Sequence, residues 1–141
     1  IQKKNIEVNI DVDNWEDAIK SVGNLLMNSK QIEDGYVNSM INSVKELGPY
    51  IVLSQGFALA HAAPNTETVH KPSLAIVTLK KPVKFGSPND PVKVLMCLAC
   101  MDKATHLDLL SKAAKKLMQE NFVENAAKCK TVDELYHVIN D

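Results

Sequence analysis

Residues 48–64 read Gly48-Pro-Tyr-Ile-Val-Leu-Ser-Gln-Gly-Phe-Ala-Leu-Ala-His-Ala-Ala-Pro64, a turn followed by two short apolar runs that Gly56 separates. Each run has the length and composition of a short strand. His61 follows the second run between alanines, and Pro64 fixes the exit path by locking its own φ. Small neighbours leave an imidazole open to a large partner, so we expect the chemistry at His61. The alternative is a histidine that only fills a loop.

The rest of the chain alternates between strand and helix patterns. Predicted strands cover residues 6–12, 50–54, 57–60, 74–79 and 92–99. Predicted helices cover residues 14–28, 35–47, 105–120, 123–127 and 132–139. Residues 81–91 contain several turn-forming residues and are predicted to be a connection. No linker or repeat divides the sequence, so we predict a single α/β domain over residues 1–141, a mixed β-sheet flanked by α-helices.

The composition argues against several functions. The net charge of −1 argues against nucleic acid as a partner, since phosphate backbones call for a basic excess. All sixteen basic residues are lysines, so a phosphate group would have to bind backbone N–H groups, hydroxyls, imidazole or lysine. The longest apolar run, residues 94–101, is too short to insert into a membrane. Three cysteines without a disulfide-dense pattern predict a cytoplasmic location.

His106 is the second candidate for the site. It lies at the beginning of the helix that follows the most apolar predicted strand. A helix N-terminus favours the neutral form of imidazole and also attracts phosphate. A half-buried histidine that binds a backbone carbonyl is an equally good interpretation. His70 is predicted to be a surface residue because it lies in a polar segment. His137 is predicted to be one because it lies off the apolar face of its helix.

The sequence gives no pattern for a metal or a cofactor. Cys97-Leu-Ala-Cys100 has a C-x-x-C spacing, but residues three apart on a strand point to opposite faces, and no second ligand pair completes a site. Both are interpreted as buried thiols. Cys129 lies between two lysines and is expected to be exposed. Glycine-rich nucleotide loops are absent. A histidine without metal ligands or a nucleotide loop suits a nucleophilic phosphoryl relay.

Several segments resemble enzyme IIA domains of the bacterial phosphoenolpyruvate-dependent sugar phosphotransferase system. They are residues 44–52, 56–64, 14–19, 83–87, 89–94 and 105–110. The resemblance is to the mannitol/fructose-type superfamily and is closest to its L-ascorbate branch. It covers nearly the whole chain and implies the fold of these IIA domains over residues 1–141. It also implies a phosphotransferase, with L-ascorbate as the expected carbohydrate; galactitol, fructose or another sugar stays open.

The resemblance also implies roles for residues and partners. His61 would accept a phosphoryl group from the phosphocarrier HPr and pass it to a cysteine of enzyme IIB, whose membrane partner IIC imports the sugar. His106 would stabilise the phosphoryl group. The apolar residues around His61 would form the docking surface: Phe57, Leu59, Ala60, Ala62 and Ala63. Two alternatives are a regulatory domain of the same fold, whose phosphorylation controls another protein, and a binding module that carries no phosphate.

The chain departs from the family at two positions beside His61. Ala60 stands where the family usually has proline, and Ala63 stands where the ascorbate branch commonly has arginine. Ala60 relaxes the loop, and Ala63 removes a cation that could steer a phosphorylated donor. We therefore expect slower or less selective transfer than in a domain that retains both residues.

Overall fold

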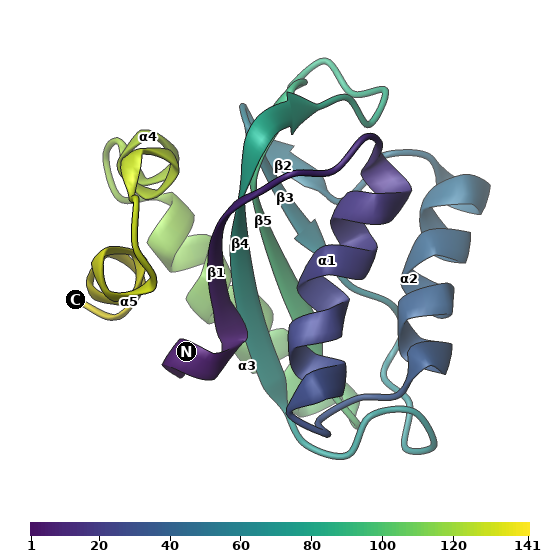
Figure 1. The fold of residues 1–141 in the computed structure, drawn as a ribbon. Coiled ribbons are helices and arrows are strands. Elements are labelled where there is room, and N and C mark those ends of the chain that lie inside the picture. Colours follow the sequence, from purple (N-terminus) through teal and green to yellow (C-terminus); the bar gives the residue numbers. More distant parts are fainter.

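The computed structural model describes residues 1–141 and contains one five-stranded sheet with helices on both faces (Figure 1). The strands are β1 (Ile6–Ile10), β2 (Val52–Ser54), β3 (Phe57–Ala60), β4 (Ser73–Val83) and β5 (Val92–Ala99). The helices are α1 (Trp15–Asn28), α2 (Asp34–Leu47), α3 (Lys103–Leu117), α4 (Phe122–Lys128) and α5 (Val132–Asn140), and a 3₁₀ turn covers Lys3–Asn5. The predicted α/β class with a mixed sheet is confirmed.

The sheet has the strand order β1-β4-β5-β3-β2. The β1–β4 and β3–β5 pairs are parallel, whereas β4–β5 and β2–β3 are antiparallel. In the β3–β5 pair the register runs from Phe57 opposite Val94 to Ala60 opposite Cys97. Because this pair is parallel, the carboxyl ends of β3 and β5 lie at the same edge of the sheet. The segments that follow both strands therefore meet there.

The two faces of the sheet have separate cores. Helices α1 and α2 cover one face, and α3, α4 and α5 cover the other (Figure 1). Strand β3 contributes to both, since Ala58 and Ala60 pack in the α1–α2 core and Phe57 and Leu59 in the α3–α5 core. A strand that is buried on both faces is apolar at every position, which explains why β3 has no polar residue.

Several boundaries differ from the prediction, among them the start of β2, which is Val52 rather than residue 50, and the end of α3, which is Leu117 rather than residue 120. Strand β4 continues to Val83, which pairs with Val92, so the predicted connection over residues 81–91 begins later. Strand β1 ends at Ile10 rather than at residue 12. Helix α3 begins at Lys103 because the Asp102 side chain accepts a hydrogen bond from the Thr105 N–H at 2.8 Å and caps the helix.

The cysteines are all buried. Cys97 packs in the α1–α2 core and Cys100 in the α3–α5 core, so the prediction that they point to opposite faces is confirmed. The expectation that Cys129 is exposed was wrong. Its thiol turns inward and donates to the Asn125 carbonyl at 3.4 Å, while the two flanking lysines remain at the surface.

Candidate active site

His61 is the first residue after β3, and its ring is half-buried. The alternation that places Phe57 and Leu59 toward α3 places His61 on the same side if it continues one step beyond the strand. The His61 Nδ1 lies 2.8 Å from the Leu59 carbonyl oxygen. A carbonyl only accepts hydrogen bonds, so Nδ1 carries the proton and donates. Nε2 then keeps its lone pair and is the nucleophilic atom of the ring.

His106 lies beside this ring. The centroids of the His61 and His106 rings are 5.6 Å apart, and their planes are inclined by 62°. His106 is in the first turn of α3, where its backbone N–H donates to the backbone carbonyl of the capping residue Asp102 at 3.1 Å. The structure thus brings together the two histidines that the sequence singled out.

The surroundings of His106 favour its neutral form. Burial lowers the pKa of His106, and the neighbouring His61 lowers it further. In the sequence analysis, the preference of His106 for its neutral form is attributed to the helix dipole. The His106 Nδ1 is buried and has no hydrogen-bond partner, so the interpretation in which a backbone carbonyl satisfies it is wrong for this atom. An unpaired buried nitrogen costs about 1–3 kcal/mol of folding free energy.

Two tyrosines that the sequence did not assign to the site hold the segment after His61. The hydroxyl of Tyr36, on α2, accepts from the Ala62 N–H at 3.0 Å and donates to the Leu98 carbonyl at 2.7 Å. The Tyr50 ring contacts the His61 ring edge-on at a centroid distance of 5.4 Å. Its hydroxyl donates to the His61 carbonyl at 3.2 Å. For Tyr36, the signal in the sequence was a hydroxyl group on the otherwise apolar, buried face of α2.

The expected docking surface needs correction. Phe57, Leu59, Ala60 and Ala62 are buried, because β3 is covered on both faces and its continuation packs against α2; only Ala63 is exposed. The apolar surface at this edge comes from other segments. Tyr50, which contacts the His61 ring, is 38% exposed, and Leu107, next to His106 in α3, is 53% exposed.

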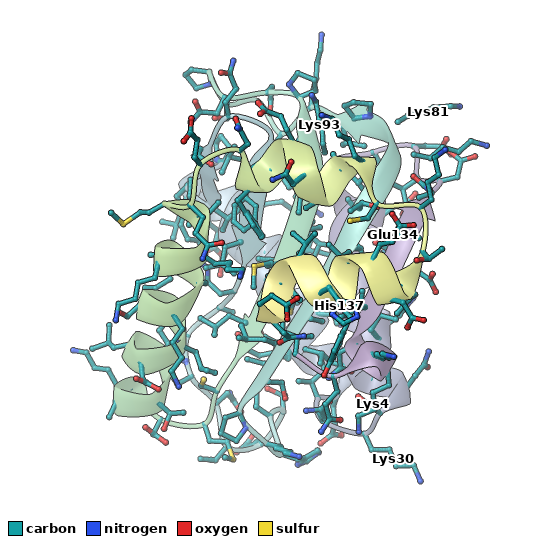
Figure 2. All side chains as sticks on the ribbon, turned by 90° about the vertical axis from the view of Figure 1, so that its left-hand side faces the viewer. Lys4, Lys30, Lys81, Lys93, Glu134 and His137 are labelled. Atoms are coloured by element: carbon teal, nitrogen blue, oxygen red, sulfur yellow. The ribbon has the colours of Figure 1, made fainter.

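The other two histidines are surface residues, as predicted. His70 pairs with Glu33 at 2.9 Å, and His137 pairs with Asp141 at 3.4 Å, with all four side chains at least half exposed. Figure 2 shows His137 on α5, on the face that α4 and α5 cover. The labelled lysines lie toward the top and the bottom of this view.

No group of three or more histidine, cysteine or acidic residues is placed to hold a metal ion. None of the helices has both the length and the apolar character that crossing a membrane requires.

Comparisons with known proteins point to one family. The family model for the phosphoenolpyruvate-dependent sugar phosphotransferase system, EIIA 2, matches residues 1–141. The ascorbate-specific PTS system EIIA component of Shigella boydii is 34% identical over 142 residues, which cover 99% of this chain and 91% of that protein.

Two solved structures share the fold. The crystal structure of mannitol IIA from Escherichia coli has a TM-score of 0.84 at 22% identity, covering 99% of this chain and 98% of that one. A complex of the same bacterium's mannitol enzyme IIA with phosphorylated enzyme IIB has a TM-score of 0.82 at 22% identity, covering 99% and 96%. At these identities the likeness establishes the architecture only.

The lowered pKa of His106 predicts a pH dependence of stability. Between the ordinary value of 6.5 and the lower folded-state pKa, the unfolded chain binds a proton that the folded protein does not. The free energy of unfolding should therefore fall as the pH drops below 6.5. His106→Gln should reduce this loss, which urea denaturation at pH 7.5, 6.5 and 5.5 would measure. Equal slopes in both proteins would contradict the prediction. The carboxyls of Asp102 and Asp133 also have lowered pKa values, but they act below pH 3.8.

Proposed function

This chain belongs to the EIIA 2 family of the phosphoenolpyruvate-dependent sugar phosphotransferase system, and we propose that residues 1–141 are a single phosphocarrier domain with His61 as the phosphorylated residue. His61 accepts the phosphoryl group from HPr and passes it to a cysteine of the cognate enzyme IIB. The membrane partner IIC then imports the carbohydrate. The observation that carries the proposal is the fixed His61 tautomer, with Nδ1–H on the Leu59 carbonyl and a second histidine ring 5.6 Å away.

The chemistry follows from that tautomer. The Nε2 lone pair of His61 attacks the phosphorus of the donor's phosphohistidine, and a new N–P bond forms. The donor's N–P bond breaks and its electron pair returns to the donor imidazole. The His61 ring then carries positive charge, which the Leu59 carbonyl stabilises by accepting the Nδ1–H hydrogen bond. In the second step the IIB thiolate attacks the phosphorus, and the N–P electron pair returns to Nε2.

His106 stabilises the phosphoryl group in this scheme. A neutral imidazole at the start of α3 donates an N–H to a phosphoryl oxygen on His61. The helix N-terminus adds a favourable field for the phosphoryl charge.

Both partners dock on the same edge of the sheet. Tyr50 and Leu107 supply exposed apolar contacts beside the two histidines. Such a surface suits two successive, transient complexes of modest area. The mannitol IIA–IIB complex, to which this chain is similar, shows that its IIA protein pairs with phosphorylated IIB. A corresponding IIB protein is the expected acceptor here.

L-ascorbate is the proposed carbohydrate. The support is the 34% identity to an ascorbate-specific EIIA component over nearly the whole chain. Because IIA hands the phosphoryl group to IIB, selectivity for the transport system is read at that protein–protein contact. We therefore expect faster transfer to an ascorbate-type IIB than to a mannitol-type IIB, by about tenfold or more. Rapid-quench assays with labelled protein would measure both rates, and a preference for the mannitol-type IIB would overturn the ascorbate assignment.

The relay itself is tested by phosphorylation. The protein, incubated with phosphoenolpyruvate, enzyme I and HPr, should gain one acid-labile phosphoryl group by intact mass. His61→Ala should abolish the gain because it removes the nucleophile. His106→Ala should slow phosphorylation by about 10- to 100-fold because it removes one hydrogen-bond donor to the phosphoryl group. This factor is at or below the usual cost of losing such a donor. His137→Ala, on the remote helix α5, is the matched control and should behave as the wild type.

The outcomes separate the alternatives. Loss of phosphate only in His61→Ala supports the relay. An unmodified wild-type protein, tested with an HPr that phosphorylates a control IIA domain, would overturn the relay and favour a regulatory or binding role. Phosphate that persists in His61→Ala would move the site to another residue.

Ala63 offers a separate test of donor steering. It is exposed two residues after His61, where an arginine could attract a phosphorylated donor. Ala63→Arg should raise the rate of phosphorylation by about two- to tenfold at low salt, and the gain should shrink at high salt because exposed charges are screened. Ala63→Gln, which adds a neutral side chain, is the control. An unchanged rate for Ala63→Arg at low salt would refute the steering argument.

A further inference from the structure

The peptide group between His61 and Ala62 is bonded at both of its polar atoms. Its oxygen accepts from the Tyr50 hydroxyl at 3.2 Å, and its N–H donates to the Tyr36 hydroxyl at 3.0 Å. A peptide group is planar, so holding both atoms fixes its orientation as a unit. That orientation sets ψ of His61, and therefore how the ring leaves the strand.

The Tyr36 hydroxyl lies at the point where the β3–β5 ladder stops. The last paired residues are Ala60 and Cys97, and Leu98 is one position further along β5. The Tyr36 hydroxyl donates to the Leu98 carbonyl at 2.7 Å, so a side chain from α2 replaces the next step of the ladder. The Tyr36 side chain is fully buried, and burial raises its pKa, which keeps the hydroxyl protonated as a donor. The chain is thereby released from the sheet at His61.

Tyr50 acts from the opposite side. It belongs to the connection between α2 and β2, and its ring meets the His61 ring edge-on with an interplanar angle of 87°. The ring limits the side-chain rotation of His61, while the hydroxyl holds the backbone carbonyl of the same residue. Two independent segments therefore fix one residue.

We propose that Tyr36 and Tyr50 are positioning residues for the phosphoryl transfer: they clamp the His61–Ala62 peptide and so keep the ring where Nδ1 meets the Leu59 carbonyl and Nε2 is free. This inference rests on the proposed relay through His61. The clamp matters more in this chain because Ala60 stands where a proline would otherwise restrict the backbone before His61.

The test uses conservative removal of each hydroxyl. Tyr50→Phe keeps the ring and its exposed apolar surface, and Tyr36→Phe keeps the buried ring. Tyr50→Phe loses one hydrogen bond and should lower kcat for phosphorylation by HPr by about five- to tenfold, with little change in KM. Tyr36→Phe loses two hydrogen bonds and should lower kcat by at least as much. The double variant should lose less than the product of the two factors, because both hydroxyls hold one peptide. Tyr136→Phe changes the remaining tyrosine of the chain, on α5, and should leave kcat unchanged.

A second measurement separates positioning from stability. Nitrogen-15 spectra of the histidine rings, with His61 assigned by comparison with His61→Ala, report which ring nitrogen is protonated. Wild type and Tyr136→Phe should show Nδ1 protonated at His61, whereas Tyr50→Phe and Tyr36→Phe should show a mixture of tautomers. Thermal unfolding identifies variants that lose stability, and Tyr50→Phe keeps the test decisive if Tyr36→Phe unfolds.

Different results would overturn the role of the two tyrosines and the phosphoryl relay itself. Wild-type protein that incorporates no phosphate overturns the relay itself. Wild-type protein that is phosphorylated, together with a Tyr50→Phe variant that keeps the wild-type kcat and the wild-type His61 tautomer, overturns the clamp alone. An effect confined to KM would also overturn it, because it would assign Tyr50 to docking.

Discussion

The parallel pairing of β3 with β5 is the constraint on which the site depends. Parallel strands end at the same edge of the sheet, so His61, which follows β3, lies close to the start of α3, which follows β5. His61 and His106 are 45 positions apart in the sequence numbering, yet their rings are in contact distance. An antiparallel pair would send the two segments to opposite ends of the sheet. This edge of an open sheet is also where ligands commonly bind in α/β proteins.

The burial of β3 on both faces determines what the site can contain. The strand has no polar side chain of its own, and its neighbours in both cores are apolar. The polar atoms at its end must therefore come from the backbone or from outside the sheet. The Leu59 carbonyl supplies the acceptor for His61, and α2 supplies the hydroxyl of Tyr36. Because these groups are shielded from water, their hydrogen bonds hold the geometry more firmly than exposed contacts would.

Much of this was accessible from the sequence, and the rest was not, for physical reasons. Apolar runs, Gly48 and the polar helix caps define the elements locally, which is why the α/β class and both histidines could be predicted. The docking residues around His61 were predicted wrongly because exposure depends on the second layer of helices, which a strand's own composition does not reveal. The roles of Tyr36 and the Leu59 carbonyl depend on contacts between segments distant in the sequence or on backbone atoms, which leave no side-chain pattern.

The neutral state of His106 suits a carrier better than a cation would. A relay must hold the phosphoryl group long enough to exchange partners, yet release it to the next nucleophile. A fully charged neighbour in a half-buried site would stabilise the phosphorylated state strongly, and that stabilisation would add to the barrier for release. A neutral imidazole still donates a hydrogen bond but contributes less to the ground state. Burial and the adjacent His61, which together lower the pKa of His106, thus bias the proposed site toward transfer in both steps rather than toward storage.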